Sequence, residues 1–364
     1  VIDGLNEAED PRAWKPLIAS LGVQLRDFPN VMLICTLRTG ARRVRERHGH
    51  FVEAAESGAR LDFADQAIPE EIPRLEIPDL GEDAVQALRK YFAFYRINAV
   101  DAELPFEILR HPLTLRFFCE VANPERKRVV GVEAMPFSLT GMFERFLVRA
   151  GERIAELSPT THRFSASEVS EALYQIGISL WSERKRELPE KAIRKTIGDD
   201  VRPWRFSIIH MLEQEGVILR IPGDIPGNQN ITAVYDALSG HLIANSLLLN
   251  SGRVGLADLL RDQTTLEALN VEEENCHPFA SDVFRGLAGL VPRYSLPRRQ
   301  LWEFLEEPHR RDALQMTANL ESRYLDHDTI VALTELLRKG EYNSKRLLRR
   351  LYSTRSSVEH ALNA

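Results

Sequence analysis

Apolar residues recur along most of this chain at the three- and four-residue spacing of amphipathic helices. The clearest stripes cover residues 14–25, 85–95 and 142–154. Such a stripe puts apolar side chains on one helix face, where a core can cover them. From residue 254 onward we expect only helices, arranged as an irregular, solenoid-like stack of helical hairpins. The pattern predicts a mostly α-helical protein.

The first forty residues follow a different pattern, which predicts an α/β remnant. An apolar run ends at Asp3, a helical stripe covers 14–28, and a second apolar run covers 31–36. Strand, helix and strand form a parallel βαβ unit with a right-handed crossover, and the second run should be a buried strand. Because parallel strands end at the same sheet edge, we expect Glu7 and Arg38 to lie near Asp3.

Carboxylates at such an edge are suited to phosphate chemistry. Asp3 could hold a Mg²⁺-bound water, and Glu7, four positions later, could orient a water that attacks a phosphate. Gly4 allows a sharp turn between them. The same residues also fit a strand end followed by a solvated turn, and Arg38 also fits a surface position in a basic loop.

Two further segments carry local signals for helix ends. After a short edge strand at 75–78, Asp79 and Glu82 form a capping-box pair that opens the helix over 85–95. Pro112 breaks one helix and can begin the next at its first turn. Alternatively, Pro112 has no binding role and only sets a kink in a helix.

Residues 138–235 predict a helical group that ends in a hairpin. Ser138 caps one helix, and Ser165 with Glu168 forms a capping box for the next. Two shorter helices follow, and then apolar runs at 217–221 and 231–235 flank dense turn chemistry. Three helices and a hairpin describe a winged helix, which often binds DNA. No Lys or Arg lies between the two runs, so we expect a packing domain.

His241 is a polar residue in an otherwise largely apolar helical segment, 236–245. A histidine can donate a ring N–H to a phosphate, but a lone histidine on an apolar face is also an ordinary core residue.

Length, charge and cysteine content further limit the class of protein. At 364 residues we expect two or three domains, and the net charge of −6 does not predict a nucleic-acid partner. The three cysteines, Cys35, Cys119 and Cys276, lack metal-ligand spacing and indicate a reducing, cytoplasmic location. No apolar run reaches the roughly 20 residues that a membrane-spanning helix needs.

Taken in order, these motifs resemble those of the STAND-class P-loop NTPases, in particular the NACHT-related prokaryotic antiviral (AVAST-type) family. The resemblance rests on D-G-x-[DN]-E at Asp3, h-P-L-x-L-x-x-F at Pro112 and Y-x-x-[FL]-[ST]-x-H-L-[IL]-A around His241. It implies four domains, namely the C-terminal part of the NTPase core (1–78), a helical lid (79–136), a winged-helix domain with linking helices (137–250), and a helical domain that begins a helical-repeat sensor (251–364).

The resemblance also implies residue roles and cofactors. Asp3, at the Walker B position, would hold Mg²⁺ through water, Glu7 would orient the attacking water, and Arg38 would sense the γ-phosphate of ATP. Pro112 would pack on adenine, and His241 would hydrogen-bond the β-phosphate of ADP.

Two departures from the family pattern bear on these roles. Asn6 stands where many NACHT proteins carry a second acid, which could slow hydrolysis. Leu242 follows His241 where the eukaryotic-type motif has an acid, so only the histidine carries over.

For the whole protein, the resemblance implies an ATP hydrolase that switches an N-terminal effector. A viral (phage) protein would be the trigger, and activated protomers would form a homo-oligomer, with no membrane and no nucleic acid except through the effector. The phosphate loop G-x-x-x-x-G-K-[ST] is not found, because no Gly-Lys dipeptide occurs. We therefore expect a fragment that begins at Walker B and is inactive alone. The alternatives are a non-catalytic scaffold and a winged-helix nucleic-acid-binding protein.

Overall fold

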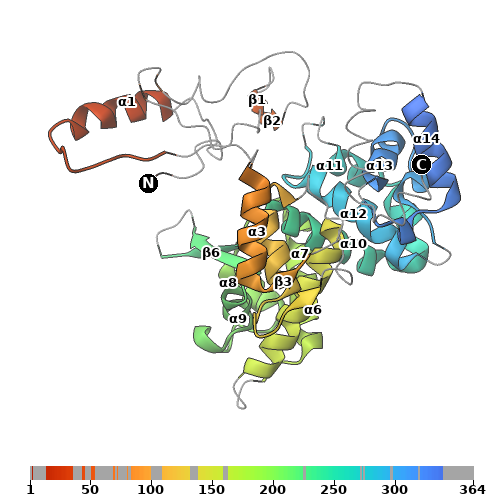
Figure 1. Cartoon of the computed structure of the whole chain (residues 1–364), viewed down its shortest axis with the longest axis horizontal. Helices are drawn as coiled ribbons and strands as arrows, with labels where there is room; N and C mark the ends of the chain where they lie inside the picture. The colour runs from red at the N-terminus through yellow and green to blue at the C-terminus, as the bar shows by residue number, and fades with distance from the viewer. Residues whose placement is uncertain are drawn as a thin grey trace. The chain divides into compact units, whose positions relative to one another are not determined.

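The chain divides into two compact units. Unit 1 comprises Val1–Ile77 and Val271–Asn275, and unit 2 comprises Pro78–Asn270 and Cys276–Ala364. A computed structural model (Figure 1) describes residues 2, 14–35, 43–45, 51–53, 69, 72, 80, 83–99, 109–131, 138–158, 163–223, 227–270, 273, 275–295, 298–318 and 320–338.

In the part of unit 1 that the structure describes, a helix packs against a short parallel pairing. Helix α1 (Trp14–Leu25) buries Ile18, whose side chain is 2% exposed and lies against Ile2 and Cys35. Ile2 and Cys35 form a parallel bridge, and the Ile2 N–H donates to the Ile34 carbonyl at 2.8 Å. The helix after Ile2 therefore returns the chain to a parallel pairing, as strand, helix and strand predict. Strands β1 (Arg43–Arg45) and β2 (Phe51–Glu53) pair antiparallel.

The second predicted strand, over 31–36, departs from expectation. Among the described residues its pairing is confined to Cys35, while Met32 is 79% and Ile34 48% exposed. The prediction of a buried strand is therefore wrong for residues 31–34. An apolar run becomes a buried strand only where neighbouring strands and a covering layer meet it along its length, and a single bridge does not supply these.

Unit 2 begins with two packed helices. Helix α3 (Ala84–Tyr95) meets α5 (Pro112–Ala122) through the rings of Phe92 and Phe118, with centroids 6.0 Å apart. The predicted capping pair before α3, Asp79 and Glu82, lies outside the described residues.

A short parallel pair of strands, β3 (Ile97–Asn98) and β4 (Val130–Gly131), closes this helical group. The sequence pattern predicts only a polar connector over residues 124–136. The side-chain amide of buried Asn123 donates to the carbonyls of Tyr95, at 2.7 Å, and Arg128, at 2.8 Å. It thereby satisfies a carbonyl at the end of α3 that has no intrahelical partner.

A helix-and-sheet group follows, and the predicted hairpin is confirmed. In its antiparallel sheet, β7 (Gln229–Ala233) lies between β5 (Leu188–Pro189) and β6 (Ile218–Pro222), with Ile218 opposite Ala233. Ser138 caps the first helix, and Ser165 with Glu168 forms the predicted capping box of the second. The elements in chain order are α6 (Leu139–Leu157), α7 (Ala166–Glu183), β5 (Leu188–Pro189), α8 (Glu190–Thr196), η5 (Trp204–Phe206), α9 (Ile208–Gln214), β6 (Ile218–Pro222) and β7 (Gln229–Ala233).

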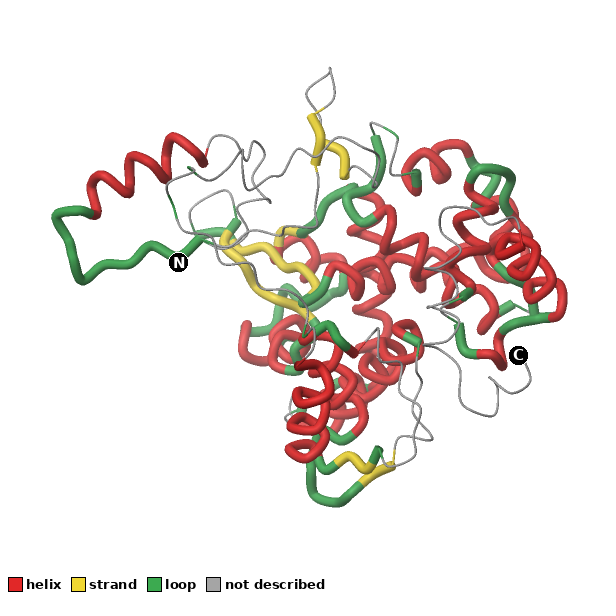
Figure 2. Tube along the Cα trace, turned by 45° about the horizontal axis from the view of Figure 1, so that its top comes forward, coloured by secondary structure: helices red, strands yellow, loops and turns green. Residues whose placement is uncertain are grey.

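After β7, every named element of the described chain is helical, as predicted for the C-terminal part (Figure 2). The elements are α10 (Asp236–Leu259), α11 (Gln263–Leu269), α12 (Ala280–Tyr294), η6 (Leu301–Phe304), α13 (His309–Thr317), η7 (Ser322–Tyr324) and α14 (His327–Arg338). The predicted domain boundary at 250/251 falls inside α10, just before a kink at Gly252 with φ 62°. Among the described residues, no helix is both long and apolar enough to cross a membrane.

Helix α10 packs against both α7 and α12 (Figure 1), and glycines set how close these helices come. A Cβ added at Gly240 of α10 would stand 2.4 Å from the backbone carbon of Asp282 on α12. A Cβ added at Gly177 of α7 would stand 2.6 Å from the Leu242 carbonyl oxygen on α10. Real Cβ atoms cannot approach backbone so closely, so these contacts require glycine.

We predict that Gly240→Ala lowers the free energy of unfolding by about 2–3 kcal/mol, because α10 and α12 must separate to admit the methyl group. Gly255→Ala is a matched control in the same helix, since its added Cβ meets only the Ser251 side chain at 3.5 Å. The control should be neutral or stabilising by up to about 1 kcal/mol through helix propensity. Chemical denaturation measures both, and an equal effect of the two substitutions would contradict the packing argument.

Candidate functional site

The structure describes two of the five predicted site residues. Asp3, Glu7 and Arg38 lie outside the described residues, so their roles stay predictions. Pro112 is the first residue of α5, follows the cap residue His111 and is exposed. His241 lies in the second turn of α10 and is buried, with 3% of its surface exposed.

His241 is an enclosed, neutral imidazole. Its ring centroid lies 5.5 Å from that of Phe143 on α6, and no described residue gives its Nδ1 atom a hydrogen-bond partner. Burial, and secondarily the positive charge of Arg293, lowers its pKa to about 3. At neutral pH the ring therefore carries one N–H, while its other nitrogen accepts hydrogen bonds.

His241 lines a cavity of about 210 Å³ within unit 2. The other walls include the first turn of α6, at residues 138–140, and Asp282 and Arg285 of α12, whose side chains pair at 2.9 Å. Pro112 is not among the lining residues. The structure thus does not bring the two predicted nucleotide contacts of unit 2 into one cavity.

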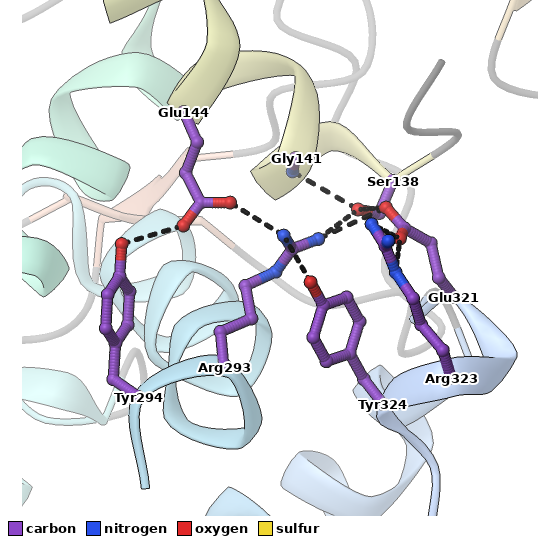
Figure 3. Close-up of polar contacts among 8 residues, drawn as sticks. All are labelled: Ser138, Gly141, Glu144, Arg293, Tyr294, Glu321, Arg323 and Tyr324. Carbon is purple, nitrogen blue, oxygen red and sulfur yellow. Dashed lines mark hydrogen bonds and ion pairs between the residues drawn. The ribbon is translucent and has the colours of Figure 1, made fainter. Parts of the chain in front are cut away.

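A buried ion-pair network lies beside this cavity (Figure 3). At its centre is Arg293 of α12, whose side chain is 8% exposed. Its guanidinium contacts Glu144 of α6 at 2.7 Å and Glu321 at 3.2 Å, and lies 4.2 Å from the centroid of the Tyr324 ring. Arg323 adds a second cation, with its Nε 2.8 Å from the Glu321 carboxylate. These four side chains carry two positive and two negative charges.

Ser138 connects the network to the cavity, and its hydroxyl is fully used. The Oγ atom accepts from the Gly141 N–H at 3.2 Å and from Arg293 at 3.0 Å, and donates to Glu321 at 2.9 Å (Figure 3). A serine hydroxyl has one donor and two acceptor sites, so none remains for a ligand. On the α6 side, the cavity is also lined by Leu139, Thr140 and Phe143.

This arrangement suits recognition better than proton transfer. An imidazole with a pKa of about 3 is a poor general base near neutral pH, but it can donate or accept a hydrogen bond. Among the described residues, no group of three or more His, Cys, Asp or Glu side chains could hold a metal ion. The predicted metal ligand, Asp3, lies outside them.

Sequence reasoning did not find the Arg293 network. Arg293 follows Pro292 near the end of an apolar helix, where a cation usually interacts with the helix dipole. Glu144 and Glu321 carry no local signal, since they lie 149 and 28 residues from their common partner. Comparisons with protein-family models, with curated proteins and with solved structures find no match to this chain.

We predict a pH dependence that His241 causes. Its pKa is about 3 in the folded protein and 6.5 for the unperturbed side chain of the unfolded protein, so between these values the unfolded chain binds more protons. Stability is therefore retained above pH 6.5 and falls as pH drops below it. Between pH 7 and pH 5 the native protein should lose about 2 kcal/mol more than His241→Leu does, by denaturant titration at each pH. His277, whose pKa burial also lowers, is present in both proteins. Identical pH profiles would contradict the buried neutral imidazole.

We predict that Arg293→Met lowers the free energy of unfolding by about 3 kcal/mol, because Glu144 and Glu321 are left without their common cation. Arg298→Met is the matched control, since exposed Arg298 contacts the same Tyr324 ring at 5.5 Å from its centroid. The control should cost less than about 1 kcal/mol. Urea unfolding curves compare the two, and a cost for Arg293→Met no larger than that of the control would show that the network contributes little.

Proposed function

We propose that this chain is part of a STAND-class ATPase switch, most similar to the NACHT-related antiviral type. In this proposal ADP holds a resting arrangement, exchange for ATP releases it, and released protomers assemble and activate an N-terminal effector. The C-terminal helices would bind the viral protein that triggers exchange.

The order of elements supports the proposal. Helices α3 and α5 lie within residues 79–136, for which the resemblance implies a lid, and α10 follows the hairpin β6-β7 directly, as the histidine helix does in that family. Helices α7, α8 and α9 with the antiparallel sheet β5-β7-β6 have the composition of a winged helix. Each of these elements is common in proteins. The support for the proposal comes from the order in which they follow one another along the chain.

The observation that carries the proposal is the environment of His241. A buried imidazole whose Nδ1 has no described partner lines a 210 Å³ cavity beside the first turn of α6. Helix N-termini attract anions through their unpaired N–H groups and the helix dipole. The terminal phosphate of a diphosphate could therefore accept from the imidazole N–H and from Arg285, while Asp282 restricts its position.

A DNA-binding role finds less support in the described residues. Arg220, the cation of strand β6, pairs with Glu190 at 2.7 Å and lies 4.2 Å from the centroid of the Trp204 ring. Helix α9, in the place of a recognition helix, has seven residues and buries Ile208, Ile209 and Leu212. Phosphate contacts need cations that are not already neutralised, so this surface is better suited to packing.

We predict that Asp3→Ala and Glu7→Gln each abolish ATP hydrolysis in a longer protein that carries the phosphate loop. Asp3→Ala should remove Mg²⁺ positioning, whereas Glu7→Gln should remove orientation of the attacking water and leave ATP binding intact. Phosphate release and nucleotide binding measured on the same samples separate the two effects. Asp27→Asn, which changes a carboxylate after α1, serves as control.

Unchanged turnover in either variant would refute the assignment. Calorimetric titration of residues 1–364 with Mg-ATP tests the fragment interpretation separately. We expect no binding at the His241 cavity, because the loop that cradles the phosphates is not in this sequence. Micromolar binding through the His241 cavity would contradict that interpretation.

A further inference from the structure

A second cavity of unit 2, of about 400 Å³, is lined by four arginines. We call it the arginine cavity. Arg116 comes from α5, Arg126 from the connection after α5, and Arg149 and Arg153 from α6. The lining also includes Glu215, just after α9, and Tyr235, just before α10. Its size falls within the roughly 300–1,000 Å³ of small-molecule sites.

The charges on the wall do not cancel. Arg116 pairs with Glu120 at 2.8 Å, and Arg153 pairs with Glu215 at 3.1 Å. Glu120 and Glu215 are the only carboxylates among the lining residues, so the four arginines leave a surplus of two positive charges. Burial raises the pKa of Glu215, and the positive charge of Arg153 opposes that rise. The Arg293 network, in contrast, is balanced.

The two remaining arginines are held in place by neutral groups. The Arg149 guanidinium donates to the Val121 carbonyl, and the Arg126 guanidinium lies 4.4 Å from the Phe94 ring centroid and 4.9 Å from that of Tyr95. Neither contact neutralises a charge. A guanidinium held in this way loses little conformational entropy when it binds an anion.

The floor of the arginine cavity is apolar and aromatic. Phe117 is buried, and Phe146 and Tyr235 are half-buried, with Phe117 lying 4.9 Å from Phe146 and 5.9 Å from Tyr235 between ring centroids. Cations over an aromatic floor match a ligand with a charged end and a flat or apolar body.

We propose that the arginine cavity binds a small organic phosphate monoester. At pH 7 a phosphate monoester carries a charge of about −1.5 to −2, which matches the surplus, and its oxygens accept paired hydrogen bonds from guanidinium groups. The organic body lies on Phe146 and Tyr235. The ligand contacts α5, α6 and the cap residue of α10 together, so binding stabilises their present arrangement.

Phenyl phosphate is the probe, since it has the charge and the flat body but neither nucleoside nor polyphosphate. Titration calorimetry on residues 1–364 should show saturable binding. Phenyl sulfate, with the same body and one charge, should bind at least fivefold more weakly, and so should inorganic phosphate, which lacks the body. Arg149→Gln and Arg126→Gln should each weaken phenyl phosphate binding at least tenfold, as expected for one charge-assisted hydrogen bond.

Arg261→Gln is the matched control, because Arg261 is exposed, pairs with Asp258 on the same surface and lines neither cavity. The Arg261→Gln variant should bind phenyl phosphate with the same affinity as the native chain. If Arg149→Gln fails to fold, Arg126→Gln decides the result, since Arg126 is exposed. No binding of phenyl phosphate, equal binding of the sulfate, or unchanged affinity in Arg126→Gln would each overturn the proposal. None of these results bears on the nucleotide switch, whose predicted residues lie elsewhere.

Discussion

Close backbone packing around α10 is the constraint on which the candidate site depends. Gly240 lets the backbone of α10 contact Asp282 of α12, and the residue that follows it in α10 is His241. Because glycine lets α10 and α12 pack so closely, the imidazole of His241 is buried against α12 and α6 and is shielded from water. Its low pKa and its unpartnered Nδ1 both follow from that burial.

The two arginine clusters of unit 2 differ in charge balance, and we use this difference to distinguish a structural network from a recognition site. Around Arg293 each cation meets a carboxylate, and the shared Ser138 hydroxyl has no remaining hydrogen-bond site. Such a balanced network fixes how α6, α12 and the η7 segment meet. The arginine cavity has more cations than carboxylates beside an aromatic floor. A surplus of charge at a concave surface favours a ligand that supplies the missing anion.

Local rules accounted for much of the fold. Ser165 and Glu168 form their capping box because both bonds lie within one helical turn, and the hairpin β6-β7 forms because turn residues separate two β-branched runs. Residues 31–34 have the same apolar character as a buried strand, yet Met32 is exposed, because burial depends on neighbours that a local pattern does not contain. Strands β3 and β4 were missed for the related reason that a two-residue parallel pairing has no periodicity to detect.

The sequence alone predicts the helical class, the helix caps and the hairpin, since each depends on residues a few positions apart. It also identifies His241 as the unusual polar residue of its helix. The enclosure and neutrality of His241, and the place of Pro112 outside its cavity, emerge only once the helices are packed. The same holds for the meeting of Arg293 with Glu144, 149 residues away, and for the presence of Arg149 and Tyr235 in the lining of one cavity. These contacts join distant segments, and their geometry is fixed by how closely helices pack, which no spacing along the chain encodes.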